Sequence, residues 1–254
     1  MIRQGILAAT IVLAALLAGC AGEGGGLETS GLSAGEVASG HSSTNPLALP
    51  APVSEGARKV IENPTVAEVM HTGTLPEMSF GREDAPVTIV QYASMTCPIC
   101  RKFHKEVFPQ FKRTYVDTGK VRYILREFPI GKTSGAATIA LRCANPEKYL
   151  ELYGKFMEQQ PAWVSQEVHL DRIYKVASQV GMTRQQFDAC RENQAMIDGL
   201  QWVKDRGRTL GVIGTPNFFV NGKLVKGALT MGQIRAAVDE ANSAPTTTAA
   251  GAPL

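Results

Sequence analysis

The chain lacks most of the features that mark nucleic-acid-binding, membrane-spanning and repeat proteins. Its 254 residues carry a formal net charge of only +3, and no run of six like charges occurs. This small charge predicts no nucleic-acid partner. No internal repeat is visible, and the apolar stretch of residues 6–18 is too short to cross a bilayer comfortably. A composition of 44% hydrophobic and 19% charged residues indicates one ordinary globular domain with accessory segments.

Aromatic residues are missing from residues 21–57, which are rich in Gly, Ser, Ala and Pro. Such a segment cannot bury enough apolar surface to order itself. We therefore predict a flexible tether over residues 20–75, with a candidate short helix in its last part. Residues 243–254 are predicted to be a disordered tail, which leaves residues 76–242 for the folded domain.

The N-terminus reads MIRQGILAATIVLAALLAGC, in which a basic residue precedes the short apolar stretch. This is the pattern of an export signal. A retained signal anchor, a cleaved secretory signal and a lipoprotein signal all fit it. The segment Leu17–Cys20, LAGC, resembles the bacterial lipobox, in which a peptidase cuts before a diacylated cysteine. The resemblance favours a lipoprotein signal peptide over residues 1–19 and a lipid anchor on Cys20.

Five cysteines are present, and one of them is Cys20. The other four are Cys97, Cys100, Cys143 and Cys190. Thiols outside the cytosol tend to oxidise. Once Cys20 is assigned to lipid, the even number that remains agrees with two disulfides but does not fix their pairing.

The stretch APVTIVQYAS, residues 85–94, is β-branched and almost continuously apolar. This is typical of a strand that is covered on both faces. From Pro98 onward an apolar residue recurs every four positions, at Ile99, Phe103, Val107, Phe111 and Tyr115. That spacing predicts a helix, which Pro109 should kink or interrupt. A second strand is predicted over Val121–Phe128, so the region forms a β-α-β unit with a parallel strand pair.

Residues 134 to about 210 have helical patterns, including a capping box formed by Thr183 and Gln186. The stretch TPNFFVNGKLVKGAL then predicts a hairpin, because Asn-Gly is typical of type I′ turns. A last amphipathic helix follows it. This order of elements fits an α/β thioredoxin-like fold with an inserted all-helical subdomain at about 134–210.

The pair Cys97 and Cys100 is open to three interpretations. A zinc site needs four ligands, usually as two close pairs, and a second close pair is lacking because Cys143 and Cys190 are 47 residues apart. His104 is the nearest further candidate ligand. A purely structural bridge between Cys97 and Cys100 would close a very small loop and remove little unfolded-state entropy. The third interpretation is a redox dithiol.

The redox interpretation has a physical basis in the predicted strand-to-helix junction. The first-turn N–H groups and the positive end of the helix dipole would stabilise the Cys97 thiolate, lower its pKa and make it the nucleophile. Cys100, one turn on, is more enclosed and can resolve a mixed disulfide. Pro98 suits the first helical turn, where its missing N–H is not needed.

Thr215 and Pro216 directly precede the predicted hairpin, and together with the Cys-x-x-Cys they resemble the cis-proline loop of thioredoxin-fold enzymes. The stretches APVTIVQYASMTCPIC, GKVRYILREFPI and GVIGTPNFFVNGK resemble DsbA-family thiol:disulfide oxidoreductases, especially those of α-proteobacteria, over about residues 76–240. The resemblance implies Cys97 as attacking thiol, Cys100 as resolving thiol, and Pro216 in cis with Thr215 beside the dithiol. It implies no cofactor and no metal. It also implies that Cys143 and Cys190 form a second, structural disulfide.

The chain departs from the family pattern at two positions that tune the dithiol. The best-known oxidases of the family carry Pro-His between the cysteines, whereas this chain has Pro98-Ile99. Isoleucine cannot stabilise a thiolate as histidine can. The family usually has a buried acid six residues before the first cysteine, where this chain has Gln91, which can form hydrogen bonds but cannot shuttle a proton. Both changes predict weaker oxidation.

The sequence thus predicts a thiol:disulfide oxidoreductase that is lipid-anchored in the cell envelope and faces the periplasm, with a soluble periplasmic protein as the alternative. It would exchange disulfides with cysteines of exported proteins, most directly to form them, and work with a membrane redox partner of the DsbB type. A disulfide isomerase or a client-specific reductase is the alternative within this chemistry. A non-catalytic binding or chaperone module is the alternative from another class.

Overall fold

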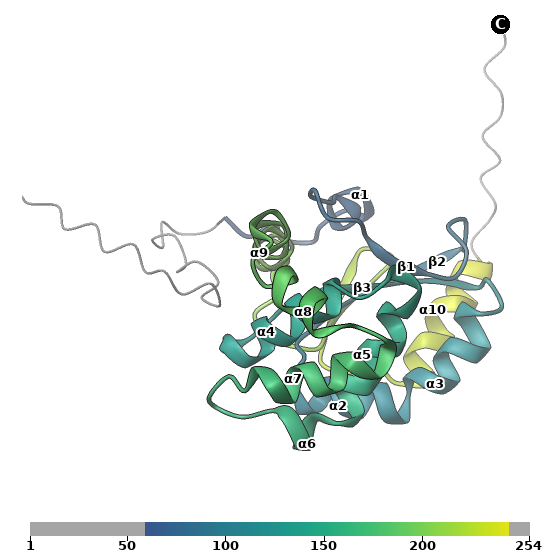
Figure 1. Cartoon of the computed structure of the whole chain (residues 1–254). Helices are drawn as coiled ribbons and strands as arrows, with labels where there is room; N and C mark the ends of the chain where they lie inside the picture. The colour runs from purple at the N-terminus through teal and green to yellow at the C-terminus, as the bar shows by residue number, and fades with distance from the viewer. Residues whose placement is uncertain (1–58, 244–254) are drawn as a thin grey trace, which may run out of the picture. The chain divides into compact units, whose positions relative to one another are not determined.

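The computed structural model describes residues 59–243 of the chain (Figure 1). The predicted signal peptide, the lipid site at Cys20, the tether up to residue 58 and the tail from residue 244 lie outside the described residues. Within residues 59–243, no helix is both long enough and apolar enough to cross a membrane.

A five-stranded mixed sheet forms the centre of the described part. In sheet order, its strands are β1 (Met78–Phe80), β3 (Val121–Glu127), β2 (Val87–Ala93), β4 (Asn217–Val220) and β5 (Lys223–Lys226). β2 and β3 run parallel, and the other neighbouring pairs run antiparallel. The predicted β-α-β unit is therefore present. β1 was not predicted, because its three residues are too few to display a strand pattern.

The central strand β2 is buried on both faces, as its continuous apolar pattern predicts. Ile89 belongs to the larger core, with residues from α2 (Pro98–Glu106), α5 (Tyr149–Glu158) and α10 (Met231–Ser243). Its neighbour Val90 belongs to a smaller core with α9 (Gln194–Thr209) and α1 (Val66–Met70). Figure 1 accordingly shows α9 and α1 on one side of the sheet and α2, α5 and α10 on the other.

The helix after β2 is interrupted where Pro109 predicts an interruption. α2 ends at Glu106, and a short α3 (Phe108–Phe111) begins with Pro109 in its first turn. A π-helical turn, η1 (Lys112–Val116), then leads to β3. Pro109 lacks the N–H that a continuous helix would use, so the chain restarts its helix at this point.

An all-helical stretch lies between β3 and β4, as predicted. In addition to α5 and α9 it contains α4 (Gly131–Arg142), η2 (Pro146–Lys148), α6 (Gln160–Trp163), α7 (Leu170–Ala177), η3 (Ser178–Val180) and α8 (Arg184–Cys190). The capping box at the start of α8 is formed, with Gln186 N donating to Thr183 Oγ1 at 3.2 Å. A disulfide joins Cys143, after α4, to Cys190 at the end of α8.

The hairpin of β4 and β5 turns at Asn221 and Gly222, which have φ angles of 47° and 87°. Two consecutive positive φ angles are what a type I′ turn requires, and Asn-Gly tolerates them. The final helix, α10, buries Ile234 and Val238 against the sheet.

Residues 59–75, which the sequence places at the end of the tether, pack against the sheet in the structure. Val69 of α1 is 2% exposed, and Arg126 Nη1 donates to its carbonyl oxygen at 2.6 Å. Arg126 also pairs with Glu77, and the two side chains are only 6% and 14% exposed. The segment covers apolar residues of the second sheet face, which would otherwise meet water.

Candidate active site

Cys97 lies at the junction of β2 and α2, where it is the N-cap residue of α2. The backbone N–H of Cys100 donates to Cys97 Sγ at 3.2 Å, and Pro98 occupies the first turn. Cys97 is 9% exposed and Cys100 is fully buried. Both thiols are free, so the structure represents the reduced dithiol. Cys97 thus keeps a small exposed fraction at a helix N-terminus, whereas Cys100 is fully enclosed.

The loop before β4 lies directly against Cys97. The peptide bond between Thr215 and Pro216 is cis, and the Cys97 thiol donates to the Thr215 carbonyl oxygen at 3.2 Å. These residues are 118 positions apart in the chain. They meet because β4 pairs with β2 in the sheet, so the residues that precede β4 reach the end of β2.

The surroundings of Cys97 favour its thiolate and lower its pKa to about 6. The hydrogen bond from the Cys100 thiol has the largest effect on this pKa. Burial opposes it, and the side chain of Thr215 and the backbone N–H groups of Cys100 and Ile99 lower the pKa further. Most of Cys97 is therefore ionised at neutral pH, and the thiolate is the reactive form.

Cys100 differs from Cys97 in its protonation. Burial raises the pKa of Cys100 well above its usual value, and the hydrogen bond to Cys97 raises it further. Gln91, which is also fully buried, accepts a hydrogen bond at its Oε1 from Tyr123 Oη at 2.6 Å. Its Nε2 has no hydrogen-bond partner within the described residues. Gln91 thus occupies a buried polar position on β2 but offers no group that titrates.

Two residues that the sequence analysis missed hold the loop before Cys97. Gln160 of α6 is 6% exposed, and its Nε2 donates to the carbonyl oxygens of Met95 and Cys97 at 2.9 and 3.1 Å. Ser134 of α4 forms hydrogen bonds with Ser94 Oγ at 2.8 Å and with Met95 N at 3.2 Å. Both come from the helical insertion, and no local motif marks either of them. The helical insertion therefore helps to position Cys97 by holding the backbone of the loop that precedes it.

The rim of the site is apolar. Ile99, between the two cysteines, is 47% exposed, and Ile130 and Ile213 are 49% and 84% exposed. Ile99 brings no polar side-chain atom to the Cys97 sulfur.

Other predicted candidates lie away from the dithiol or do not gather into a metal site. Cys143 and Cys190 pack against Ile139 and Met196 in a separate small core. Burial lowers the pKa of His104 to about 4, and its ring stacks on Phe108. Within residues 59–243, no group of three or more His, Cys, Asp or Glu side chains is arranged to hold a metal ion.

Comparison with known proteins reveals relatives of the same architecture and chemistry. A family model described as thioredoxin matches residues 74–240, more than half of the chain. A Rickettsia conorii protein, named as a candidate protein-disulfide oxidoreductase, is 30% identical over 196 residues, which cover 74% of this chain and 69% of that protein. This chain is a protein-disulfide oxidoreductase of the thioredoxin family.

Solved structures of thioredoxin-fold oxidoreductases agree with this assignment. Wolbachia pipientis alpha-DsbA1 superposes with a TM-score of 0.62 at 24% identity, covering 68% of this chain and 94% of that one. A thioredoxin-like oxidoreductase from Silicibacter pomeroyi has a TM-score of 0.56 at 27% identity, covering 66% and 93%. The predicted thioredoxin-like fold with a helical insertion and the predicted likeness to the DsbA family are confirmed. So is the predicted activity: the protein is a thiol:disulfide oxidoreductase that acts on cysteine-containing substrates.

Proposed function

We propose that this oxidoreductase faces the periplasm and donates the Cys97–Cys100 disulfide to cysteine pairs of exported proteins. The observation that carries the proposal is the contrast between the two thiols. Cys97 keeps a small exposed fraction and has a pKa of about 6, whereas Cys100 is fully buried and burial raises its pKa well above the usual value. Cys97 is thus suited to form a mixed disulfide with a client, and Cys100 is suited to react within the protein to break or re-form the bond to Cys97.

The exchange proceeds in two displacement steps. A client thiolate attacks Cys97 Sγ of the oxidised protein, the Cys97–Cys100 bond breaks, and Cys100 leaves and takes up a proton. A second client thiolate then attacks the client sulfur of the mixed disulfide and releases Cys97 as a thiolate. Two electrons pass from the client to the protein, and the client gains one disulfide. In the opposite direction, Cys97 attacks first and Cys100 resolves the mixed disulfide.

The low pKa of Cys97 supports the oxidising direction. A stabilised thiolate stabilises the reduced protein relative to its disulfide, and this makes the disulfide a better oxidant. Ile99 adds no polar group to that stabilisation, and Gln91 cannot accept the proton of Cys100 as an acid would. We therefore propose a weaker oxidant than relatives with Pro-His at these positions, with Pro98, Ile99, Gln91 and Thr215 as tuning residues.

The decisive experiment is disulfide transfer to a reduced, unfolded client with two cysteines. The oxidised mature chain should form one client disulfide per dithiol produced, as measured by mass spectrometry after acid quenching. The reduction potential, measured against glutathione, should then lie in the range of an oxidase. A potential near that of thioredoxin, about −270 mV, would support a reductase. Failure to transfer any disulfide would overturn the proposed function and favour the alternative of a non-catalytic binding module.

The proposed location rests on the LAGC segment, Leu17–Cys20, at the end of the apolar stretch. Lipid on Cys20 would hold the enzyme at the membrane, where a DsbB-type partner could reoxidise the dithiol. Cys20→Ala should release the protein from membranes and remove the acyl mass from its N-terminus. An unmodified N-terminus at another residue, detected by mass spectrometry of the native protein, would instead support the soluble periplasmic form.

A further inference from the structure

A cleft of about 540 Å³ opens between the loop after β3, the loop before Pro216 and the end of α9. Its walls include apolar side chains and two cations. We call it the basic cleft and define it by Val60, Ile130, Ile213, Lys204 and Arg208.

Two residues of the basic cleft, Ile213 and Ile130, connect it to the segments that hold Cys97. Ile213 lies two residues before Thr215, whose carbonyl oxygen accepts the hydrogen bond from Cys97. Ile130 flanks the Cys97 loop, since its N–H donates to Ser94 Oγ at 3.3 Å and its carbonyl oxygen accepts from Thr96 Oγ1 at 3.5 Å. A client held by a disulfide to Cys97 would therefore have its neighbouring residues over this cleft.

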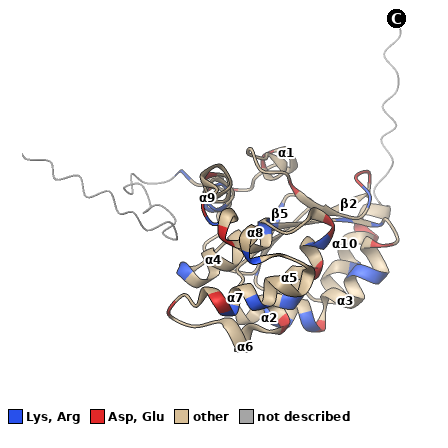
Figure 2. Ribbon diagram, in the orientation of Figure 1, with Lys and Arg blue, Asp and Glu red and all other residues tan. Residues whose placement is uncertain are grey.

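Positive charge gathers on the wall that α9 supplies. Lys204 and Arg208 are four residues apart, so both project from one face of the helix. Figure 2 shows basic and acidic residues on this helix, and Arg208 pairs with Asp205 at 3.2 Å. Lys204 is half-buried and has no ion-pair partner among residues 59–243. Burial lowers the pKa of Lys204, the nearby Arg208 lowers it further, and Asp205 opposes both. A carboxylate in the cleft would relieve both unfavourable effects on the Lys204 charge.

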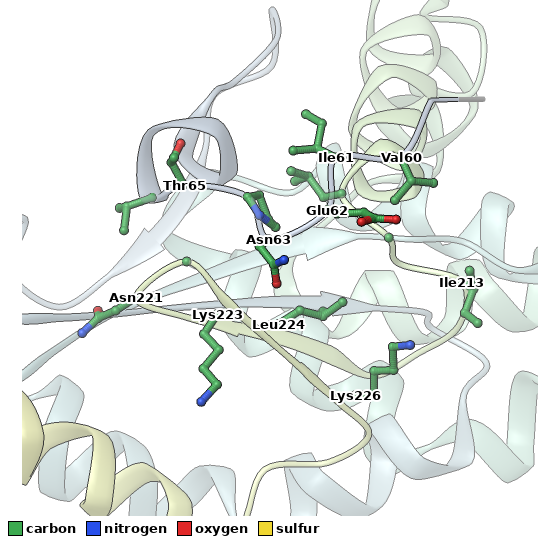
Figure 3. Close-up of a pocket in the computed structure, with 15 residues that line it drawn as sticks. Val60, Ile61, Glu62, Asn63, Thr65, Ile213, Asn221, Lys223, Leu224 and Lys226 are labelled. Carbon is green, nitrogen blue, oxygen red and sulfur yellow. The ribbon is translucent and has the colours of Figure 1, made fainter. Parts of the chain in front are cut away.

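The apolar part of the cleft suits a polypeptide better than a small anion. Ile213 is 84% exposed and Ile130 is 49% exposed, and both line the cleft. Val60 and Ile213 also line a second cleft of about 1000 Å³ along the edge strand β5 (Figure 3). A client segment thus has apolar surface to cover and room to continue beyond the basic cleft.

We propose that the basic cleft selects client segments that carry an Asp or Glu side chain close to the reactive cysteine. Lys204 and Arg208 would receive the carboxylate, while Ile130 and Ile213 cover the apolar residues between it and the cysteine. Charge complementarity of this kind sets partner choice and association rate more than it sets affinity. The inference rests on the proposed function, because it assumes that clients form their mixed disulfide at Cys97.

The test uses three dithiol peptides that differ only in the residues flanking their cysteines, which are Glu, Gln or Lys. For each peptide we would measure the rate at which it reduces the oxidised full-length chain at low ionic strength. This rate is divided by the rate at which the same peptide reduces oxidised dithiothreitol. That ratio corrects for the effect of the flanking charges on the pKa of the peptide cysteines. We expect the corrected rate for the Glu peptide to exceed that for the Gln peptide about fivefold, and added salt to reduce the difference.

Variants locate the source of this preference. The Glu-to-Gln rate ratio should fall to about one in Lys204→Met/Arg208→Met, and Lys204→Glu/Arg208→Glu should favour the Lys peptide. The matched control is Lys102→Met/Lys105→Met, which removes the same charge from α2 and should keep the ratio. If the double variant does not fold, as judged by circular dichroism, Lys204→Met alone breaks no ion pair and should lower the ratio to about two.

The outcomes separate this inference from the proposed function. Transfer to the Gln peptide reports the proposed function alone, and its absence would overturn both proposals. Transfer to the Gln and Glu peptides at equal corrected rates would overturn only the selection of acidic clients. The preference for the Glu peptide could also survive in Lys204→Met/Arg208→Met, or fall equally in the α2 control. Either result would show that the preference comes from the overall charge of the protein, and would also overturn the inference.

Discussion

The Cys97 thiol donates a hydrogen bond to the Thr215 carbonyl oxygen at 3.2 Å, although 118 residues separate the two in the chain. Thr215 lies two residues before β4, and the pairing of β4 with β2 brings this loop to the end of β2, where a client would bond to Cys97. The reacting sulfur and a backbone acceptor of the cis-proline loop are therefore held together. An extended client segment could use that acceptor while its cysteine reacts.

The two cysteines should respond differently to substitution by serine. Cys97→Ser should abolish exchange with a reduced client, because the reactive thiolate is lost. Cys100→Ser should instead accumulate mixed disulfides with clients, since attack by Cys97 continues but resolution does not. Non-reducing gels with mass spectrometry of the trapped species measure both effects. Trapping by Cys97→Ser rather than Cys100→Ser would reverse the assigned roles.

The pKa of Cys97, about 6, predicts a pH dependence of both reactivity and stability. The alkylation rate of the reduced protein by iodoacetamide should rise with a midpoint near pH 6. The pKa is depressed in the folded state, so between pH 6 and 9 the unfolded chain binds more protons. Over that range the free energy of unfolding of the reduced protein should rise by at most about 1.4 kcal/mol per pH unit.

Cys97→Ser is the control for that stability effect, because it removes the titrating group. Its urea-denaturation midpoints should change less between pH 6 and 8 than those of the reduced parent. Equal pH dependence in the two proteins would show that another group is responsible.

The residue between the cysteines should set the redox potential. Ile99→His should lower the pKa of Cys97 and raise the reduction potential, because an imidazole can stabilise the thiolate. Each 30 mV of increase corresponds to about 1.4 kcal/mol of added stability for the reduced form. Ile213→His is the matched control, since Ile213 is also exposed at the rim but lies outside the dipeptide. If Ile99→His leaves both quantities unchanged, the tuning lies elsewhere, with Thr215 as the first candidate.

Gln160 should be required for the geometry of the Cys97 loop. Gln160→Ala removes the donor shared by the carbonyl oxygens of Met95 and Cys97 and should lower the free energy of unfolding by about 1–3 kcal/mol. It should also slow client oxidation, because the nucleophile loses its support. The neighbouring Gln159 pairs with Gln179 at the surface, so Gln159→Ala should change neither quantity appreciably. Equal behaviour of the two variants would exclude a positioning role for Gln160.

The disulfide between Cys143 and Cys190 should stabilise the helical insertion without entering the exchange. In the chain-entropy model a closed loop of this length contributes roughly 4 kcal/mol. The double variant Cys143→Ser/Cys190→Ser should show this loss in urea denaturation while it still oxidises clients below its melting temperature. Peptide mapping of the native protein should recover the cross-linked pair, and two free thiols there would contradict the prediction.

Local patterns were sufficient to predict the elements around the dithiol. The continuous apolar run of residues 85–94 predicts a strand buried on both faces, and the four-residue spacing after Pro98 predicts the helix that Cys97 caps. The Asn221–Gly222 turn and the capping box of α8 follow from side-chain chemistry within a few residues. The position of Thr215 beside Cys97 was expected only through family resemblance, since nothing local joins the two residues.

Neighbours in the chain are therefore enough to predict the dithiol at a helix N-terminus, its dipeptide and the order of strands and helices. The distant groups that support this chemistry become visible only in the folded chain. Gln160 reaches the Cys97 loop from 63 residues away, and residues 59–75 cover a sheet face although their composition resembles a tether. Buried carbonyl groups need hydrogen-bond partners and apolar surface needs cover, and the fold supplies both from residues that are far apart in the chain. Local sequence patterns do not indicate such contacts.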